Sequence, residues 1–268
     1  MASTPKYNKL AGKRVLVIGG TTGIGFCVAE GCLEHGATVI LTGSSDETAQ
    51  RAVARLRASY PSAGADQLFG YGCDLAVAIK DIEANVTALL EKATEGGSKL
   101  LDHIAFLAGD DFSLRAPISE VQLEGIAPLL TVRLYGGVAV AKLAPRYMAV
   151  SPASSLTLTS GVLSARPVDG MALITTLGSA VSALGLALAL ELRPIRVNVI
   201  SPGLVYTERM DRALPESERE AYRQRGKAAT TTGEVGNPVD VAEAYLYVMR
   251  DRFVTGQDIG SNGGRTLV

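Results

Sequence analysis

Short runs of β-branched and aliphatic residues alternate with longer helical patterns along almost the whole chain, and this alternation restricts the fold most. The runs are nearly continuous hydrophobic stretches, as expected for strands buried on both faces. Their alternation with helices predicts a parallel sheet covered by helices on both sides. The expected strands are Arg14–Ile18, Thr38–Thr42, Gln67–Gly72, His103–Leu107, Ser155–Thr159, Arg196–Ile200 and Gln257–Gly260. The expected helices are Gly23–His35, Glu47–Ser59, Val77–Thr94, Ala127–Ala149, Gly170–Leu192 and Val239–Met249.

The length and composition fit one α/β domain. The chain has 268 residues, of which 47% are hydrophobic, enough to build a sizeable core. We expect a single Rossmann-type domain over residues 1–268, with a doubly wound parallel sheet of about seven strands. Residues 1–11 read as an N-terminal tail. The polar segment 208–238 follows the sixth strand and suits a lid over a substrate site; the alternative is an exposed helix plus a loop.

Charge and cysteine content narrow the partners and the compartment. The net charge of −1 gives no field that would attract nucleic acid or an anionic membrane. The three cysteines show no CxxC spacing and read as small core residues of a reduced protein. No signal-like N-terminus and no apolar run of membrane-spanning length is evident, so we expect a cytoplasmic protein.

A glycine pattern at the first strand–helix junction predicts a phosphate-binding loop. Gly19, Gly23 and Gly25 have the spacing G-x-x-x-G-x-G. Glycine lets the backbone approach a pyrophosphate, and the following helix offers free N–H groups and the positive end of its dipole. The position of the pattern, at the start of a βαβ series, favours a dinucleotide site over an ordinary turn.

This glycine spacing resembles that of the short-chain dehydrogenase/reductase family, and the resemblance spans essentially the whole chain. Further matches follow in order: Asp74-Leu75 after the third strand, "LAG" at 107–109, "SPGLVYTERM" after the sixth strand and "TGQDIGSNGG" near the end. The resemblance implies an NADPH/NADP⁺ or NAD site. The cofactor-binding residues that it implies are Gly19, Thr21, Thr22, Gly23, Ile24, Gly25, Ser44, Ser45, Asp74, Leu75, Ala108, Gly109, Ser160, Pro202, Gly203 and Thr207.

The end of the second strand favours the phosphorylated cofactor. A carboxylate there would bind both ribose hydroxyls and repel a 2′-phosphate. The residues are instead Thr42, Gly43, Ser44 and Ser45, which offer hydroxyl groups, although no arginine accompanies them. We therefore predict NADP(H) rather than NAD(H).

The catalytic half of the family pattern is incomplete. The family's serine matches Ser160, but its tyrosine and lysine positions fall on Leu173 and Leu177. None of the nine tyrosines is followed by a lysine four residues later, so the dyad is absent rather than displaced. Arg133 stands at the family's asparagine position, and Asp169 precedes the next helix. Arg133 also reads as a surface helix residue, and Asp169 as an N-cap.

Loss of the acid favours a substrate that needs no proton. Hydride addition to a ketone creates an alkoxide, whereas addition to an iminium creates a neutral amine. The chain resembles the fungal bifunctional reductase/Diels–Alderases of paraherquamide and malbrancheamide biosynthesis, which also lack the dyad. That resemblance implies reduction of a cyclic prenylated tryptophan–proline iminium, an indole alkaloid intermediate, followed by an intramolecular [4+2] cycloaddition. It assigns the catalytic pair to Asp169 and Arg133, with Arg133 orienting Asp169.

Two other functions remain open from the sequence. An NADP(H)-binding pseudoenzyme would need only the intact cofactor loops, and a ketone reductase would need a substitute acid. Neither histidine forms a metal cluster or a Ser-His-Asp arrangement with other residues of the pattern, so no metal site is expected. The helices at 127–149 and 170–192 occupy segments through which the family usually associates, so the resemblance implies a homodimer or homotetramer.

Overall fold

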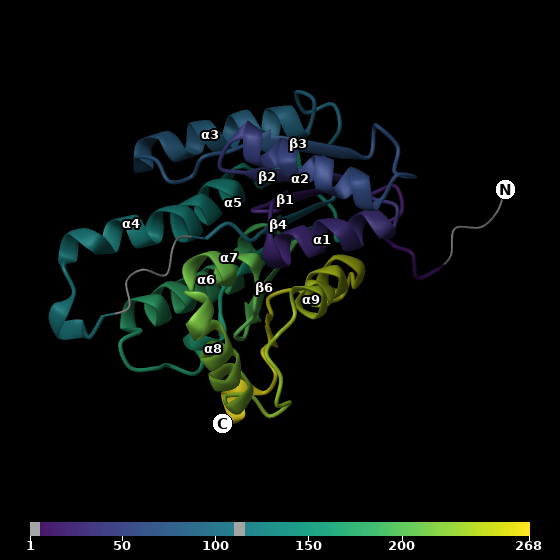
Figure 1. Ribbon diagram of the computed structural model, residues 1–268. Coiled ribbons are helices and arrows are strands. Elements are labelled where there is room, and N and C mark those ends of the chain that lie inside the picture. The colour runs from purple at the N-terminus through teal and green to yellow at the C-terminus, as the bar shows by residue number, and fades with distance from the viewer. Residues whose placement is uncertain (1–5, 110–115) are drawn as a thin grey trace.

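The computed structural model describes residues 6–109 and 116–268, which form one seven-stranded parallel sheet with helices on both faces (Figure 1). The strand order is β3-β2-β1-β4-β5-β6-β7. The predicted fold class is confirmed, and every predicted strand appears with ends shifted by no more than two residues. The strands are β1 (Arg14–Ile18), β2 (Thr38–Gly43), β3 (Leu68–Gly72), β4 (His103–Phe106), β5 (Ser155–Thr159), β6 (Arg196–Pro202) and β7 (Asp258–Ser261).

The predicted helices appear as well, with one important interruption. The segment predicted as a single helix over 127–149 divides into α4 (Ile126–Leu130), a π-helical turn η3 (Thr131–Tyr135) and α5 (Gly136–Tyr147). Two shorter helices occupy the segment predicted as a lid. The remaining helices are α1 (Gly23–Glu34), α2 (Asp46–Ser59), α3 (Ile79–Ala93), α6 (Ala172–Glu191), α7 (Glu208–Ala213), α8 (Glu216–Ala228) and α9 (Pro238–Arg250).

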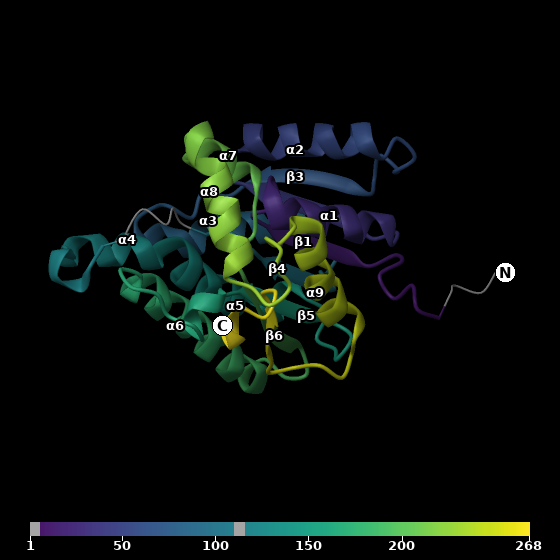
Figure 2. The same cartoon turned by 60° about the horizontal axis from the view of Figure 1, so that its bottom comes forward.

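The alternation of side chains along each strand separates two hydrophobic clusters. Leu16 and Ile18 of β1 pack with α3, α5 and α6, whereas Val15 and Val17 pack with α1, α2 and α9. Figure 2 shows these two helical layers on opposite faces of the sheet. All four β1 side chains are at most 1% exposed. Burial of an aliphatic side chain of this size contributes about 1.5–3 kcal/mol, so the two clusters fix the sheet that presents the loops.

The order of the strands reverses between β1 and β4, and this reversal positions the site. From β1 the chain proceeds to β2 and β3 in one direction, and from β4 to β7 in the other. The loops that leave β1 and β4 therefore diverge at the carboxyl ends of the strands, where open α/β sheets bind their ligands. The two loops begin in register because Leu107 N and Ala108 N both donate to Ile18 O, at 2.8 and 2.9 Å.

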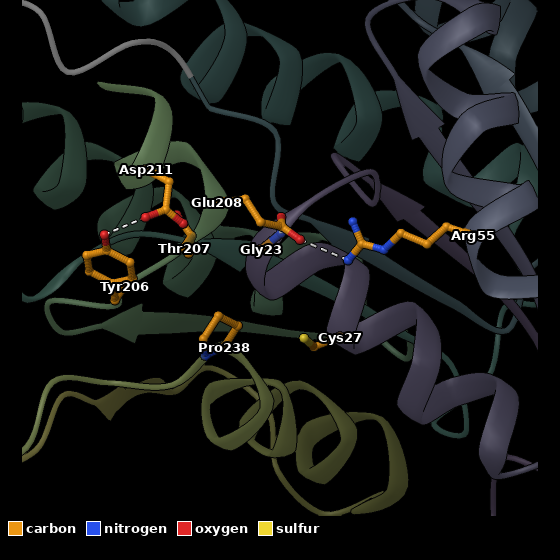
Figure 3. A pocket seen from close by; sticks show the side chains of 8 residues that line it. All are labelled: Gly23, Cys27, Arg55, Tyr206, Thr207, Glu208, Asp211 and Pro238. Atoms are coloured by element: carbon orange, nitrogen blue, oxygen red, sulfur yellow. Dashed lines mark hydrogen bonds and ion pairs between the residues drawn. The ribbon is translucent and has the colours of Figure 1, made fainter. Parts of the chain in front are cut away.

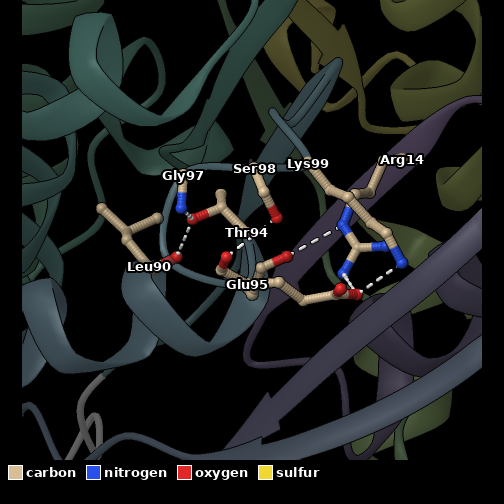
Figure 4. Close-up of polar contacts among 8 residues, drawn as sticks. Arg14, Leu90, Thr94, Glu95, Gly97, Ser98 and Lys99 are labelled. Carbon is tan, nitrogen blue, oxygen red and sulfur yellow. Dashed lines mark hydrogen bonds and ion pairs between the residues drawn. The ribbon is translucent and has the colours of Figure 1, made fainter.

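At the amino ends of the strands, polar contacts stabilise the turn that follows α3 (Figure 4). Thr94 Oγ1 accepts from Gly97 N at 3.0 Å, and Glu95 adopts a left-handed conformation at φ 52°. The Glu95 carboxylate pairs with Lys99 at 2.8 Å and with Arg14 at 3.5 Å. These contacts fix the entry to β4 at its amino end, so they serve the fold rather than the site.

The segment predicted as an N-terminal tail is partly integrated into the core. Its first five residues lie outside the described part of the chain. Leu10 is fully buried in the cluster with α1, α2 and α9. Gly12 N also donates to Gly36 O at 2.9 Å. The end of this segment therefore packs on the sheet instead of extending from it.

Two helical stretches, Leu123–Tyr147 and Ala172–Glu191, are long and apolar enough to cross a membrane by length and composition alone. Both contribute to the hydrophobic cluster on the same face of the sheet. Core helices of α/β domains pass the same test, so these stretches are weak evidence for a membrane assignment. Their outer faces carry exposed apolar side chains, including Val138, Leu186 and Leu190.

Candidate active site

The residues that the sequence assigned to a cofactor gather at the carboxyl edge of the sheet. Each group follows a different parallel strand, so the strand order places the groups side by side along this edge. The first group leaves β1 and opens α1, and the second leaves β2. The others leave β3, β4, β5 and β6: Asp74 and Leu75, Ala108 and Gly109, Ser160, and finally Pro202, Gly203 and Thr207.

The loop between β1 and α1 is packed so closely that a side chain would not fit. A Cβ on Gly25 would lie 2.1 Å from Gly19 O. Thr22 is the N-cap of α1, but its side chain makes no capping hydrogen bond. The first turn of α1 therefore presents backbone N–H groups that its own N-cap side chain does not use, with Ile24 in this turn. This geometry fits the phosphates of a dinucleotide.

The end of β2 is lined by hydroxyl groups. Ser45 caps α2, and its hydroxyl accepts from Thr48 N at 3.3 Å, while Ser44 is exposed. A Cβ on Gly43 would lie 2.9 Å from the Thr21 methyl group, so the hydroxyl-bearing residues of the two loops are neighbours. The next acidic residue, Asp46, accepts from Gly72 N at 2.6 Å and is thereby engaged at β3. The tip fits a 2′-phosphate better than a free ribose diol.

The loops after β3 and β6 complete the cofactor edge. Asp74 Oδ1 accepts from Ala76 N at 2.9 Å, which makes a tight turn, and Leu75 is buried beneath it. Thr207 lies against the glycine loop, because its methyl group would be 3.1 Å from a Cβ on Gly23. The β6–α7 connection therefore closes over the amino end of α1.

Ser160 is buried and bonded to α6. Its hydroxyl donates to Gly178 O at 2.8 Å and lies 3.0 Å from Ser182 Oγ. Ser182 in turn contacts Asp258 Oδ2 at 2.5 Å. The serine side chain, which is 6% exposed, thus ties the end of β5 to the helix.

The two leucines place only apolar side chains at the positions of the family's dyad on α6. Leu177 is 3% exposed and belongs to the hydrophobic cluster, and Leu173 packs against that cluster while remaining partly exposed. Neither side chain has a group that donates or accepts a proton. Helix α6 therefore presents hydrocarbon beside Ser160, where carbonyl chemistry would need an acid.

Arg133 lies in the π-helical turn and points toward the ends of two strands. Its Nη1 donates to Thr159 O at 3.0 Å and to Ser160 O at 3.1 Å. A Cβ on Gly109 would lie 2.1 Å from Arg133 Nη2, so the guanidinium rests on the loop after β4. Single π-helical turns are frequent at functional sites. The interpretation of Arg133 as an ordinary surface residue is wrong, because its guanidinium links β4, β5 and η3.

Asp169 lies in the turn before α6 and is exposed. The alternative that it caps α6 is wrong, because the N-cap is Met171 and no side chain caps the helix. Gly170 O accepts from Ala116 N at 3.1 Å, which anchors this turn to the segment after β4. Within the described residues, Asp169 makes no ion pair with Arg133.

Sequence reasoning missed a small cavity between the first turn of α1 and the β6–α7 connection (Figure 3). Its volume is about 210 Å³. Glu208 Oε2 accepts from Gly23 N at 3.0 Å, and Glu208 Oε1 pairs with Arg55 Nη2 at 2.9 Å. The only sequence signal was the position of Glu208 directly after Thr207. Six of the lining residues are Gly23, Cys27, Arg55, Tyr206, Thr207 and Glu208.

Cys27 in this cavity is not an activated nucleophile. Burial, together with the nearby carboxylates of Glu30 and Glu208, raises the pKa of its thiol to about 11. A thiol with this pKa is neutral near pH 7 and unreactive. The cavity therefore suits binding through backbone N–H groups and Arg55 rather than covalent chemistry.

Comparison with known proteins agrees with this geometry. Residues 6–268 match the family described as SDR-like Rossmann domain, and the chain belongs to the short-chain dehydrogenase/reductase family. The loops found here at the carboxyl ends of the strands are the cofactor loops of this family.

Two curated relatives cover nearly the whole chain. The short-chain dehydrogenase/reductase ucsE of Acremonium sp is 37% identical, covering 99% of this chain and 99% of its own length. The short-chain dehydrogenase/reductase malC of Malbranchea aurantiaca is 37% identical, covering 96% of each chain.

Solved structures show the same arrangement. The MalC reductase/Diels–Alderase of Malbranchea aurantiaca superposes with a TM-score of 0.91 at 36% identity, over 98% of this chain and 100% of that one. A short-chain dehydrogenase of Burkholderia cenocepacia in complex with NADP superposes with a TM-score of 0.80 at 25% identity, over 96% and 99%.

Proposed function

We propose that the chain is an NADPH-dependent reductase and intramolecular Diels–Alderase. Its substrate is a cyclic iminium of the prenylated tryptophan–proline type, and its product is a bridged indole alkaloid core. The observation that carries the proposal is that α6 has only the apolar side chains of Leu173 and Leu177 at the positions of the family's dyad, where the proton donor would stand. The similarity to MalC, described as a reductase/Diels–Alderase, supports the same reaction type.

The cofactor edge supports NADPH as the reductant. When bound, NADPH supplies a hydride to the carbon of the iminium. The chain contributes the N–H groups of the first turn of α1 for the phosphates, and the hydroxyls of Ser44 and Ser45 for the 2′-phosphate. The solved relatives in complex with NADPH and NADP support this choice.

An iminium substrate accounts for the missing acid. Hydride addition to C=N⁺ forms a C–H bond and leaves a neutral amine, so the active site has no proton to deliver in this step. Positive charge disappears instead, and a nearby carboxylate stabilises the ground-state cation before reduction. A buried leucine is compatible with this step, whereas it would leave an alkoxide from a ketone without a donor.

We assign the charge-handling roles to Asp169 and Arg133. The Asp169 carboxylate holds the cationic ring and accepts a proton as the azadiene forms. Arg133 orients Asp169 when the substrate draws the turn before α6 inward. The bonds of Arg133 to Thr159 O and Ser160 O support this role, because they fix the guanidinium from one side.

The cycloaddition needs shape rather than acid–base chemistry. Folding diene and alkene together in one conformer removes much of the entropic barrier of the reaction and selects one product face. The apolar side chains of α6, which packs against the π-helical turn, offer such a wall. The same hydrocarbon surface therefore serves both steps.

The decisive experiment is an anaerobic incubation of the protein, NADPH and a prenylated tryptophan–proline iminium, with the products separated by chiral chromatography. We expect consumption of NADPH and one enantiomer of the cycloadduct. Asp169→Asn should lose turnover or yield a racemate. Asp81→Asn, which makes the same change at an exposed position of α3, is the matched control and should behave as the unchanged protein.

The other outcomes separate the alternatives. A racemate equal to the protein-free control, with NADPH bound but not consumed, contradicts the proposal and indicates a silent cofactor-binding protein. Oxidation of NADPH by simple ketones, with a titrating proton donor, indicates a ketone reductase with a substitute acid.

We further propose that the protein acts in the cytoplasm on this small molecule and that it self-associates as a homodimer or homotetramer through α5 and α6. Val138, Leu186 and Leu190 on these helices are 42–69% exposed. Apolar side chains on neighbouring helices of one layer favour burial against a second copy. Sedimentation of the protein, compared with a Leu186→Glu/Leu190→Glu variant, measures this association, and an unchanged oligomeric state would contradict it.

A further inference from the structure

The Glu208 carboxylate occupies the place at α1 that suits a phosphate. Gly23 is the first residue of the helix, and its N–H has no partner within the helix. Glu208 Oε2 accepts from this N–H at 3.0 Å. A carboxylate at this position also benefits from the positive end of the helix dipole. The chain thus supplies its own anion to the amino end of α1.

Arg55 holds the second oxygen of the same carboxylate. Its Nη2 lies 2.9 Å from Glu208 Oε1, and its guanidinium stacks over the Phe26 ring at 3.6 Å from the centroid. The stacking on α1 fixes the guanidinium beside the helix terminus without help from Glu208. Figure 3 shows Arg55 and Glu208 reaching this point from opposite sides, one from α2 and the other from α7.

The ion pair between Arg55 and Glu208 is weak enough for a ligand to replace it. The side chains of Arg55 and Glu208 are 48% and 46% exposed, and ion pairs with this exposure contribute about 1 kcal/mol or less. Glu208 is also the first residue of α7, so a ligand that displaces its side chain acts at the start of the segment predicted as a lid. A pyrophosphate carries two charges and several acceptor oxygens, and it would compete for both the N–H and the guanidinium.

We propose that Glu208 is an internal competitor of the cofactor's pyrophosphate, and that Arg55 passes from Glu208 to the pyrophosphate when NADPH binds. Arg55 is then a cofactor-binding residue on α2, outside the glycine loop. Glu208 sets the affinity for NADPH and links cofactor entry to movement of α7. This inference rests on the proposed use of NADPH, but not on the identity of the substrate.

The test is a set of dissociation constants measured by NADPH fluorescence, with adenosine 2′-phosphate as a second ligand that lacks the pyrophosphate. Glu208→Gln removes the competing charge, so the Kd for NADPH should fall by about threefold to tenfold. The Kd for adenosine 2′-phosphate, measured by calorimetry, should not change. Glu216→Gln removes the same charge from exposed α8 and should alter neither constant.

Arg55 is tested where Glu208 no longer interferes. Adding Arg55→Gln to Glu208→Gln should raise the Kd for NADPH by about threefold or more, because the pyrophosphate then loses its cation. An equal Kd in the single and double variants would show that Arg55 does not bind the cofactor. An unchanged or higher Kd in Glu208→Gln would overturn the competition.

A general effect of net charge gives a different result from the proposed exchange. Tighter binding of adenosine 2′-phosphate by Glu208→Gln would assign the effect to charge and overturn the proposal. A wild-type protein that binds no NADPH would overturn the proposed function as well. Normal binding with the pattern expected for the variants, but no cycloadduct, would leave the exchange standing and remove only the proposed reaction.

Discussion

Replacing Leu177 by lysine returns the family's residue to a position that has become part of the core. The leucine is 3% exposed and belongs to the hydrophobic cluster on this face of the sheet. A fully buried lysine has its pKa lowered by roughly three units or more, because the interior disfavours the ammonium ion. At about 1.4 kcal/mol per unit, Leu177→Lys should lose about 4 kcal/mol of unfolding free energy near pH 7.

The pH dependence of this loss identifies its cause. The unfolded chain holds the lysine proton up to about pH 10.4, whereas the folded chain releases it roughly three units lower. Between these values the unfolded state binds more protons, so the variant gains stability as the pH rises. From pH 7.5 to pH 9.5 the deficit should shrink by about 2.7 kcal/mol.

Urea unfolding of Leu177→Lys, Leu177→Met and the unchanged protein at both pH values measures the effect. Methionine keeps the volume and should cost less than about 1.5 kcal/mol at either pH. We also expect no ketone reduction by Leu173→Tyr/Leu177→Lys. A deficit in Leu177→Lys below about 1 kcal/mol that does not depend on pH would refute the reasoning, because it would show a solvated site.

Three further outcomes follow from close contacts and one buried group. Gly109→Ala places a Cβ 2.1 Å from Arg133 Nη2, so the flexible arginine side chain must move. Thermal stability should change little, while the enantiomeric excess of the cycloadduct should fall. An unaltered enantiomeric excess would argue against a role for Arg133. In Gly25→Ala the new Cβ would lie 2.1 Å from the backbone oxygen of Gly19. This clash should abolish NADPH binding and lower the unfolding free energy by about 1–3 kcal/mol. Normal NADPH binding in a fluorescence titration would contradict this expectation. Burial lowers the pKa of His103 to about 3, so below pH 6.5 the unfolded state binds the extra proton and stability falls by up to about 1.4 kcal/mol per pH unit. His103→Asn should lack this part of the acid sensitivity in denaturant titrations, and equal slopes for the two proteins would count against it.

The sequence predicts the fold well because both faces of the sheet are buried. In Arg14–Ile18 four consecutive aliphatic residues follow the arginine, and all five residues of Ser155–Thr159 are buried; both strands have the predicted ends. The glycine loop is equally easy to predict, because Gly19 has a positive φ of 86° and Gly25 packs against the backbone oxygen of Gly19 within the same loop. Local constraints of this kind leave a direct trace in the sequence.

Contacts between distant segments leave a weaker trace. Glu208 and Arg55 meet because α2 and the β6–α7 connection converge on α1, and no spacing in the sequence indicates their pairing. The N-cap alternative for Asp169 failed because α6 begins at Ala172, two residues later than the predicted start at Gly170. The π-helical turn was not predicted because helical structure continues on both sides of it, in α4 and α5, so the sequence reads as one uninterrupted helix.

Because of the π-helical turn, the direction of the Arg133 side chain depends on the number of residues between α4 and α5. An α-helix advances about 100° per residue, and a π turn accommodates one residue more than an α turn of the same span. Deleting Leu134 or Tyr135 would restore a regular helix of nearly the same span and shift Arg133 by one position, which turns its side chain around the axis by about that angle. With α5 fixed in the core, the guanidinium would leave β5 although every side chain around it is unchanged. A lineage could therefore gain or lose this arginine contact through a single codon insertion or deletion, without substituting any residue of the site.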